Sequence, residues 1–585
     1  MNKIFFKLLM SVLLALGAAA PAVQAQVMEP KGVRSVSVFK RIPILDNGRI
    51  KPLDTYARNL LVQLSGRQSF KGKPAVAWLA RLVFSPDLAK TDKVFLINHP
   101  AIPGELGIAA DKHRRYSFAE LEPHLDQLTE IARAAQNISE KERDVVDAEV
   151  IRIFNNLRTF VDLTHVFQFA FPTTDFTVSD PQVSELLGFP NEQTQFSFLD
   201  IAFAAEPMLK AMDDLQRKDS SSWNAQDQMI VGLVSNLFRW SQVYKDLPLT
   251  IVPTGDERGT WISPWDAIAI NFRDDTTRRE MNFLRNVVVS YWNGEQLQFD
   301  LNTRLYIDSV KGRMGERPAK VLRRMDTELF YNKADFFLYS KMLYLFAFVL
   351  FLVSLVFHQR VWHKIGVAAV VLGFIPHVWA LALRIIILER PPVSNLYETF
   401  IFVGFVVVLL GLWIEYFNRK WLGLVTASVG GFILLMIAAK YSAEGDTLKM
   451  LIAVLNSNFW LSTHVISITA GYGSTCAAGI LGHVYLLQAI FKKKDTKLLE
   501  STYYTLAGML GLALTLTFLG TNLGGIWADQ SWGRFWGWDP KENGALMIVL
   551  WTAMLFHMRI AHWIGPVGLA VGAVLGTIVV VWAWF

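Results

Sequence analysis

The sequence contains a single cysteine and few charged residues for its length. Cys476 is the only cysteine among 585 residues, and it lies inside an apolar stretch. The chain therefore has no internal disulfide, no CxxC redox pair and no CxxCH haem attachment site of its own, so any thiol chemistry must come from a partner. Charged residues make up only 18% of the chain and hydrophobic residues 52%. This balance indicates a membrane protein.

The excess of basic residues is small and does not indicate nucleic-acid binding. The formal net charge is +6. The lysines and arginines that stand out lie in short loops between apolar runs, which is how a membrane protein marks its cytoplasmic side. We therefore expect the membrane, and no nucleic acid, as the partner of these charges.

Long apolar runs are absent from the first half of the chain once the N-terminus is set aside. Residues 1–25 combine Lys3 and Lys7 with a short apolar core and a small-residue cleavage site. They are predicted to be a signal peptide, or a signal anchor if uncleaved. Residues 26–335 are predicted to form a mostly helical extracytoplasmic domain of unknown role, in which Asp46-Asn47-Gly48 is a turn signal.

Residues 336–585 consist almost entirely of long apolar runs. Each run is near or above the length that crosses about 30 Å of hydrocarbon. They predict a mainly α fold, a polytopic helical membrane bundle of about eight spans. The runs are 338–357, 365–388, 397–416, 421–439, 459–490, 501–520, 543–563 and 566–585.

The basic loops agree with an N-terminal domain on the periplasmic side of a bacterial inner membrane. If that domain is outside, the most basic loops all fall inside, as the positive-inside rule requires. The same orientation places an outer loop, residues 521–542, on the periplasmic side. The basic residues assigned to the cytoplasmic side are Arg360, Lys364, Arg419, Lys420, Lys492, Lys493, Lys494, Lys497 and Arg559.

This outer loop contains an unusual concentration of aromatic residues. Interfacial tryptophans often form only an aromatic belt, but a belt requires neither the nearby Gly524, Gly525 and Gly533 nor an Asp-Pro-Lys-Glu sequence. Glycines allow close backbone approach, and indoles offer rigid area to a flat apolar ligand. Arg534 and Lys541 suit the carboxylates of such a ligand. The segment reads Trp532, Gly533, Arg534, Phe535, Trp536, Gly537, Trp538, Asp539, Pro540, Lys541 and Glu542.

This segment resembles the tryptophan-rich WWD signature, WGxxWxWDPKE, of haem-handling proteins in cytochrome c maturation, and in particular the CcsA (ResC) branch of the System II cytochrome c synthase. Two further motifs match that branch in order, Ser394-Asn395-Leu396-Tyr397-Glu398 and Trp460-Leu461-Ser462-Thr463-His464-Val465. The resemblance covers about residues 365–585. Residues 46–56 also resemble the extension of long CcsA-like proteins.

The resemblance implies a function and a set of site residues. Haem b, as a non-covalent substrate, would contact Trp532, Gly533, Arg534, Trp536, Trp538, Asp539 and Pro540. His464 corresponds to an external iron ligand of the family and His557 to an intramembrane one. Because His557 lies fifteen residues beyond Glu542, about 22 Å deeper at 1.5 Å per residue, the two histidines imply two haem stations.

The resemblance also implies partners. The chain lacks the spans of the CcsB (ResB) half, so a CcsB-like membrane subunit is expected, together with apocytochrome c carrying CxxCH and a thiol-reducing partner. Family members continue past the eighth span into a loop with a second external histidine, whereas this sequence ends at Phe585. A truncated or split product and a protein that binds haem through one ligand both fit.

Two other histidines within the spans have weaker interpretations. His483 is a structural residue, or it pairs with His557 on an inner haem. His377, beside Pro376, is a packing or kink residue. No catalytic acid or base is predicted, and Asp539 and Glu542 suit a scaffold for the loop and the start of the next helix.

The predicted function is haem transport across the inner membrane and presentation to apocytochrome c for thioether attachment. In this role the chain acts mainly by positioning, as the subunit of a haem lyase type of synthase. One alternative is a haem exporter or chaperone that hands haem over without making the bond. A second is a membrane assembly scaffold that binds no haem.

Overall fold

The computed structural model describes most of the chain, in two compact units that span Met1–Met325 and Asp326–Phe585. The division lies close to the boundary predicted between residues 335 and 336. The predicted signal peptide, residues 1–25, lies outside the described residues. The described ranges are 30–190, 192–215, 222–256, 259–271, 274–314, 318–357, 360–443, 445–451, 457–492 and 495–584.

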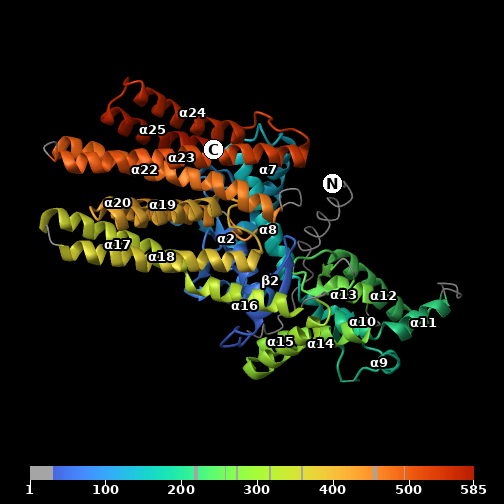
Figure 1. The fold of residues 1–585 in the computed structure, drawn as a ribbon. Helices are drawn as coiled ribbons and strands as arrows, with labels where there is room; N and C mark the ends of the chain where they lie inside the picture. Colours follow the sequence, from blue (N-terminus) through green and yellow to red (C-terminus); the bar gives the residue numbers. More distant parts are fainter. Residues whose placement is uncertain are drawn as a thin grey trace. The chain divides into compact units, whose positions relative to one another are not determined.

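The first unit is mostly helical, as predicted (Figure 1), and its strands pair into small two-stranded antiparallel sheets. The pairs are β1 (Pro43–Asp46) with β2 (Arg49–Pro52), β3 (Ser69–Phe70) with β4 (Lys73–Pro74), β5 (Phe95–Leu96) with β6 (Arg115–Tyr116), β7 (Pro172–Thr177) with β8 (Gln195–Ser197), and β9 (Val252–Pro253) with β10 (Trp261–Ile262). The helices are α2 (Leu53–Ser65), α3 (Ala75–Phe84), α4 (Pro86–Ala89), α5 (Ala101–Glu105), α6 (Phe118–Leu121), α7 (Leu125–Asn137), α8 (Val145–Thr164), α9 (Pro181–Leu187), α10 (Phe198–Phe203), α11 (Ala205–Leu215), α12 (Ala225–Val243), α13 (Pro264–Asn271), α14 (Asp275–Asn293) and α15 (Gln296–Lys311).

The predicted turn at residues 46–48 is confirmed. Asn47 and Gly48 both have positive φ, 51° and 75°, which is the geometry of the tight turn that joins β1 to β2. Lys51 of β2 is buried, and its ammonium group lies 2.7 Å from the Asp46 carboxylate. The hairpin leads directly into α2, so this stretch is a structural element of the first unit.

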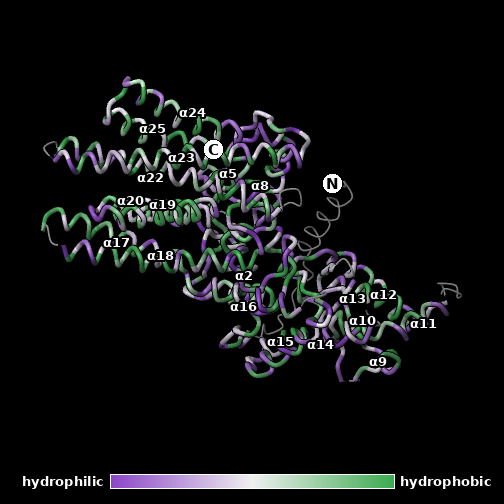
Figure 2. Tube along the Cα trace, in the orientation of Figure 1, coloured by the Kyte–Doolittle hydropathy of each residue, from purple (hydrophilic) through white to green (hydrophobic). Residues whose placement is uncertain are grey.

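Among its described residues, the second unit contains eight helices long and apolar enough to cross a membrane, which confirms the predicted multi-pass bundle. Figure 2 shows that these helices are hydrophobic along most of their length. They are α17 (Phe336–Phe357), which α16 (Pro318–Ala334) precedes, α18 (Arg360–Leu388), α19 (Leu396–Asn418), α20 (Leu422–Ser442), α22 (Ile466–Phe491), α23 (Thr496–Trp532), α24 (Pro540–Ile560) and α25 (Pro566–Trp584).

Helix α22 holds a central place in this bundle because it packs against α19, α23 and α25. Helix α24 contacts α23 and α25. Close approach depends on small residues: a Cβ built on Gly471 of α22 would lie 2.5 Å from the Thr517 methyl group of α23. Such contacts are typical of membrane helices, whose association relies on packing.

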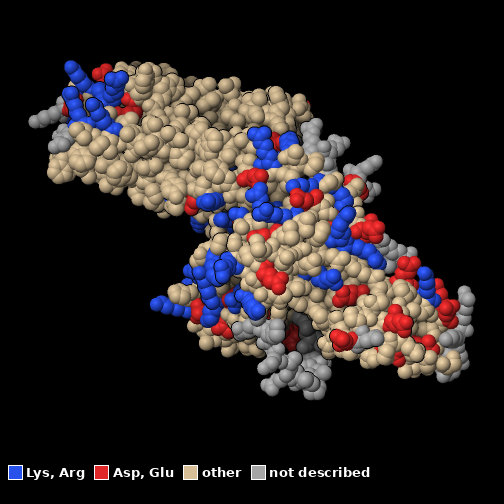
Figure 3. Space-filling view, turned by 90° about the horizontal axis from the view of Figure 1, so that it is seen from below, with Lys and Arg blue, Asp and Glu red and all other residues tan. Residues whose placement is uncertain are grey.

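The lateral surface of the bundle carries few charges, and basic side chains gather at one end of it (Figure 3). The loops at that end follow α17, α19, α22 and α24, and they include Arg419, Lys420 and Lys492. An apolar belt with charged ends is what a bilayer requires. This arrangement agrees with the predicted sidedness without testing it.

The tryptophan-rich loop, predicted over residues 521–542, is shorter than predicted. Residues 521–532 continue α23 as regular helix, and only residues 533–539 connect it to α24. The predicted boundary at 521 was placed where the apolar run ends, but loss of hydropathy does not break a helix. Helix α23 ends only at Gly533, whose φ of 67° forms a left-handed C-cap.

Candidate functional site

His464 lies where the chain enters α22. It belongs to a single π-helical turn, η6 (Leu461–Val465), between the short helix α21 (Asn458–Trp460) and α22. Such turns are rare and frequently mark functional sites. The Nδ1 atom of His464 lies 2.7 Å from the carbonyl oxygen of Gly520 on α23.

This hydrogen bond fixes the tautomer of His464. A carbonyl oxygen can only accept, so Nδ1 carries the proton and Nε2 keeps its lone pair. None of the hydrogen bonds among the described residues uses Nε2 of His464. An imidazole held in this way is ready to bind a metal through Nε2.

Gly524 makes room for the His464 ring. A Cβ atom built on Gly524 would lie 2.6 Å from Cε1 of that ring. The adjacent Gly525 accommodates Phe535 in the same manner, with a built Cβ 2.5 Å from the Phe535 ring. We expected these glycines to allow close approach of a ligand, but in this structure the chain's own side chains occupy the space.

Two tryptophans that were not predicted as site residues, Trp460 of the His464 motif and Trp527, lie beside His464. Trp460 and Trp527 stack with their ring centroids 6.4 Å apart and their planes 12° apart. The Trp527 ring centroid is 5.8 Å from that of His464, and Trp460 Nε1 donates to Gln530 over 3.1 Å. Trp460 belongs to the motif that contains His464, and Trp527 lies within residues 521–532, so the sequence places each near the site, but only the packing of α21 against α23 brings the two rings together.

The tryptophans at the connecting loop, of which Trp532 and Trp538 are exposed and Trp536 is half-buried, do not form one flat platform. Trp532 is the last residue of α23 and is 52% exposed, while Trp538 is 69% exposed. Trp536 and Trp538 meet edge to face, with centroids 5.9 Å apart and planes at 86°. The loop therefore offers indole surfaces in two orientations near the end of α23.

A network centred on Glu542 holds the loop in shape. Its carboxylate accepts from the backbone N–H of Gly537 at 2.7 Å, and Asp539 accepts from the N–H groups of Lys541 and Glu542, both at 2.9 Å. Asp539 and Glu542 form a capping box, with Pro540 as the first residue of α24. The predicted scaffold role of both carboxylates is confirmed.

The two basic residues of the loop have partners within the chain. The Arg534 guanidinium lies against Gly537 and is 3.8 Å from the Glu542 carboxylate, with its side chain 46% exposed. The Lys541 ammonium donates to the carbonyl oxygen of Trp584, the last residue of α25. Binding of ligand carboxylates by either residue stays a prediction.

The motif at residues 394–398 is built around a buried carboxylate. Glu398 is fully buried, with one oxygen 2.7 Å from Arg384 and the other 2.8 Å from Arg390, and both arginines are also buried. The Ser394 hydroxyl donates to the same carboxylate at 2.7 Å, and the Asn395 side chain caps α19. Since Arg390 also donates to the carbonyl of Lys449, the motif fastens the segment after α20 to the bundle.

The deeper histidines are not gathered into one site. His557 is exposed on α24, whereas His483 on α22 lines a cavity to which His557 does not contribute. His377 is fully buried, with Nε2 2.9 Å from the carbonyl of Ile401 and Nδ1 3.1 Å from the Tyr344 hydroxyl. Both nitrogens of His377 are engaged, which agrees with a packing role. The pairing of His483 with His557 stays a prediction.

Among the described residues no group of three or more His, Cys, Asp or Glu side chains could hold a bare metal ion. Lone imidazoles suit a different kind of metal. An iron already held by the four nitrogens of a porphyrin needs only an axial ligand from the protein, and histidine is a usual one.

Comparisons with known proteins agree on the membrane unit. Residues 393–585 match the family of cytochrome C assembly proteins. The chain is 32% identical over 248 residues to Protein NrfI of Wolinella succinogenes, which covers 40% of this chain but only 27% of that relative. It is 24% identical over 282 residues to the cytochrome c biogenesis protein CcsA of Trieres chinensis, with 41% of this chain and 89% of the relative covered, and 31% identical over 206 residues to CcsA of Chlamydomonas reinhardtii, with 33% and 56% covered.

Proposed function

Residues 393–585 make this chain a member of the CcsA-type cytochrome c assembly family, and from this premise we propose that it moves haem across a bacterial inner membrane and presents it to apocytochrome c. Haem b would be a non-covalently bound substrate. The first unit and the tryptophan-rich loop would lie on the periplasmic side. The chain spans only about a quarter of the length of NrfI, so the activity of the whole protein is part of this proposal.

The observation that carries the proposal is the state of His464. Its Nδ1 is tied to the Gly520 carbonyl, and its Nε2 is left for an iron atom. Trp460 and Trp527 stack beside the ring, and exposed indoles follow at Trp532, the last residue of α23, and at Trp538 in the loop after it. Aromatic area next to an available imidazole fits a large, flat, apolar ligand whose iron lacks an axial partner.

The loop residues would complete this outer station. Gly533, Arg534, Trp536, Asp539 and Pro540 lie with Trp532 and Trp538 in the capped turn between α23 and α24. Arg534 is half exposed and can exchange its 3.8 Å contact with Glu542 for a ligand carboxylate. A planar guanidinium suits such a bidentate contact.

His557 would serve a second, inner station. Helix α24 is continuous from Pro540 to Ile560, so the fifteen residues from Glu542 to His557 correspond to about 22 Å. The His557 side chain is exposed on the bundle surface, where a CcsB-like subunit could supply an opposite ligand. An ionisable side chain placed within a span usually serves function.

The chemistry assigned to the outer station needs positioning and no catalytic acid or base. Each cysteine thiol of a CxxCH motif adds across one haem vinyl group, with sulfur bonding to one carbon and hydrogen to the other, so no electrons are gained or lost overall. The thiols must be reduced beforehand, which requires a thiol-reducing partner. Holding both reactants in attack geometry can supply about 7 to 11 kcal/mol.

A second candidate is a haem exporter that passes haem on without forming the bond. It is favoured by the exposure of His557, which makes the inner histidine accessible from outside the bundle. The two candidates differ in one product, covalently haem-stained cytochrome c. A scaffold that binds no haem would give neither this product nor haem absorbance.

The test is expression of the chain with a CcsB-like subunit and a CxxCH cytochrome in cells without a maturation system of their own. We expect covalently stained cytochrome c from the wild type and at least a tenfold loss with His464→Ala. Haem-loaded protein without stained cytochrome would favour the exporter. Equal staining with His464→Ala would refute the role of His464.

A further inference from the structure

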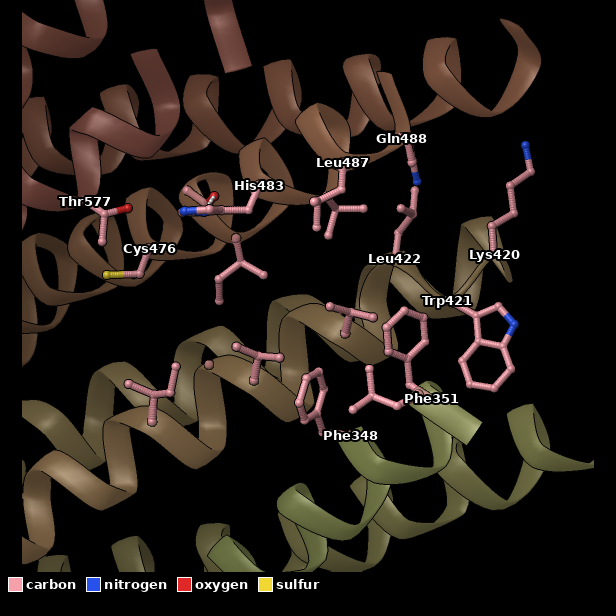
Figure 4. A pocket seen from close by; sticks show the side chains of 18 of the residues that line it. Phe348, Phe351, Lys420, Trp421, Leu422, Cys476, His483, Leu487, Gln488 and Thr577 are labelled. Carbon is pink, nitrogen blue, oxygen red and sulfur yellow. Dashed lines mark hydrogen bonds between the residues drawn. The ribbon is translucent and has the colours of Figure 1, made fainter. Parts of the chain in front are cut away.

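A large apolar cavity opens on the membrane unit between α17, α20, α22 and α25 (Figure 4). Its volume is about 970 Å³, at the upper end of the range for small-molecule sites. Aromatic and aliphatic side chains such as Phe348 and Phe351 form most of its wall. The size and lining suit a rigid apolar molecule much larger than a solvent cluster.

His483 is the imidazole within this cavity. Its Nδ1 lies 2.8 Å from the carbonyl oxygen of Gly479, one turn earlier on α22, so Nδ1 must carry the proton. Nε2 of His483 then keeps its lone pair, and none of the hydrogen bonds among the described residues uses it. In Figure 4 the ring extends into the space near Cys476 and Thr577. His483 thus resembles His464 in having Nδ1 bound to a backbone carbonyl and Nε2 available, although its carbonyl partner lies on its own helix and that of His464 on α23.

Two lysines stand at the opposite end of the cavity. Lys420, just before α20, and Lys492, just after α22, both line it at the basic end of the bundle. Neither takes part in an ion pair among the described residues. Nine residues separate His483 from Lys492, about 13 Å along the helix, a span that flexible lysine stems can shorten.

The other end of the cavity leads toward the outer loop. Trp584 lines the cavity, and its carbonyl accepts the hydrogen bond from Lys541 at the start of α24. From Cys476 to Lys492 the lining of α22 extends over sixteen residues, or about 24 Å. The cavity therefore extends from the basic end of the bundle to Trp584, whose backbone contacts Lys541 at the start of α24.

We propose that this cavity is a haem-binding site on the transport route, with His483 as axial ligand and with Lys420 and Lys492 binding the two haem carboxylates at its mouth. An acyl chain of a lipid would satisfy the apolar walls. A lipid acyl chain, however, would bind neither the available imidazole of His483 nor the two lysines at one edge of the cavity. The inference rests on the proposed haem function and assigns it a third histidine, separate from His464 and His557.

The test removes the two histidines of the proposed function first. In purified full-length protein carrying His464→Ala and His557→Ala, titration with haemin should still give one binding event with the Soret band of histidine-ligated haem. Adding His483→Ala should abolish that event, while adding His562→Ala, a change in the exposed loop after α24, should not. Size-exclusion elution checks that every variant is folded.

A second arm tests the lysines through the ligand. In the same background, Lys420→Gln with Lys492→Gln should weaken haemin at least tenfold and leave haemin dimethyl ester, which lacks the carboxylate charges, unaffected. Equal weakening of both ligands would overturn the role of the lysines. Haemin binding that persists in the triple histidine variant, or phospholipid as the only ligand found in the cavity, would overturn the site. Loss of the outer haem in His464→Ala alone tests the proposed function separately.

Discussion

Replacing Gly524 by alanine should disturb the His464 site directly. The added Cβ would lie 2.6 Å from Cε1, 3.0 Å from Nδ1 and 3.2 Å from Nε2 of the imidazole. Carbon atoms in contact prefer about 3.5 to 4.0 Å, so the ring must withdraw by about 1 Å or α23 must move away. Overpacking of this kind costs about 1 to 3 kcal/mol, and losing the 2.7 Å hydrogen bond to Gly520 costs about 0.5 to 1.5 kcal/mol more.

Part of this cost falls on the haem-bound state. If it amounts to about 1.4 to 2.8 kcal/mol, haem affinity drops about 10 to 100-fold. The assay is a haemin titration of purified protein followed at the Soret band. Gly508→Ala on the same helix is the matched control, because nothing lies within 4 Å of its built Cβ, and it should bind as the wild type does. Equal affinity of Gly524→Ala and Gly508→Ala would refute the geometry assigned to His464.

Three further predictions concern the scaffold. Glu398→Gln leaves two buried arginines without their carboxylate and should destabilise the membrane unit by about 3 to 5 kcal/mol. An unchanged melting temperature in detergent would contradict the buried network. Asp539→Ala removes a capping side chain worth about 0.5 to 2 kcal/mol and should speed amide hydrogen exchange in the first turn of α24, but not in α25. Burial lowers the pKa of His165 below its ordinary value, so the unfolded state binds the proton at a higher pH than the folded state does. As the pH falls below about 6.5, the free energy of unfolding therefore declines by at most about 1.4 kcal/mol per pH unit. With His165→Asn, the stability of α8 measured by hydrogen exchange should depend less on pH. An unchanged pH dependence would mean that other groups cause it.

Hydropathy and charge predict the membrane unit well. Long apolar runs have few alternatives to spanning helices, and all eight are present. Hydropathy fails to predict the structure of residues 521–532, because this more polar segment still continues the helix. Its small residues Gly524 and Ala528 pack inward or against side chains. Hydropathy reports where a helix leaves the apolar phase, while Gly533 determines where it ends.

Contacts between distant residues lie beyond what the sequence can predict. The motif at residues 394–398 marks the family, but only the fold brings Arg384 and Arg390 to Glu398. Likewise the π turn at His464 and its bond to Gly520 depend on how α22 packs against α23. For His483, the sequence left a structural role and a pairing with His557 open, and the structure adds the cavity around it.

Whether His464 binds haem iron can be measured by comparing the absorption spectra of the purified full-length wild type and His464→Ala. We expect a Soret band in the wild type that, in His464→Ala, loses intensity and changes position because an axial ligand is missing. Wild-type protein saturated with haemin and washed should retain more haem than the variant. An identical spectrum and identical haem content in both proteins would contradict the assignment of His464 as an iron ligand.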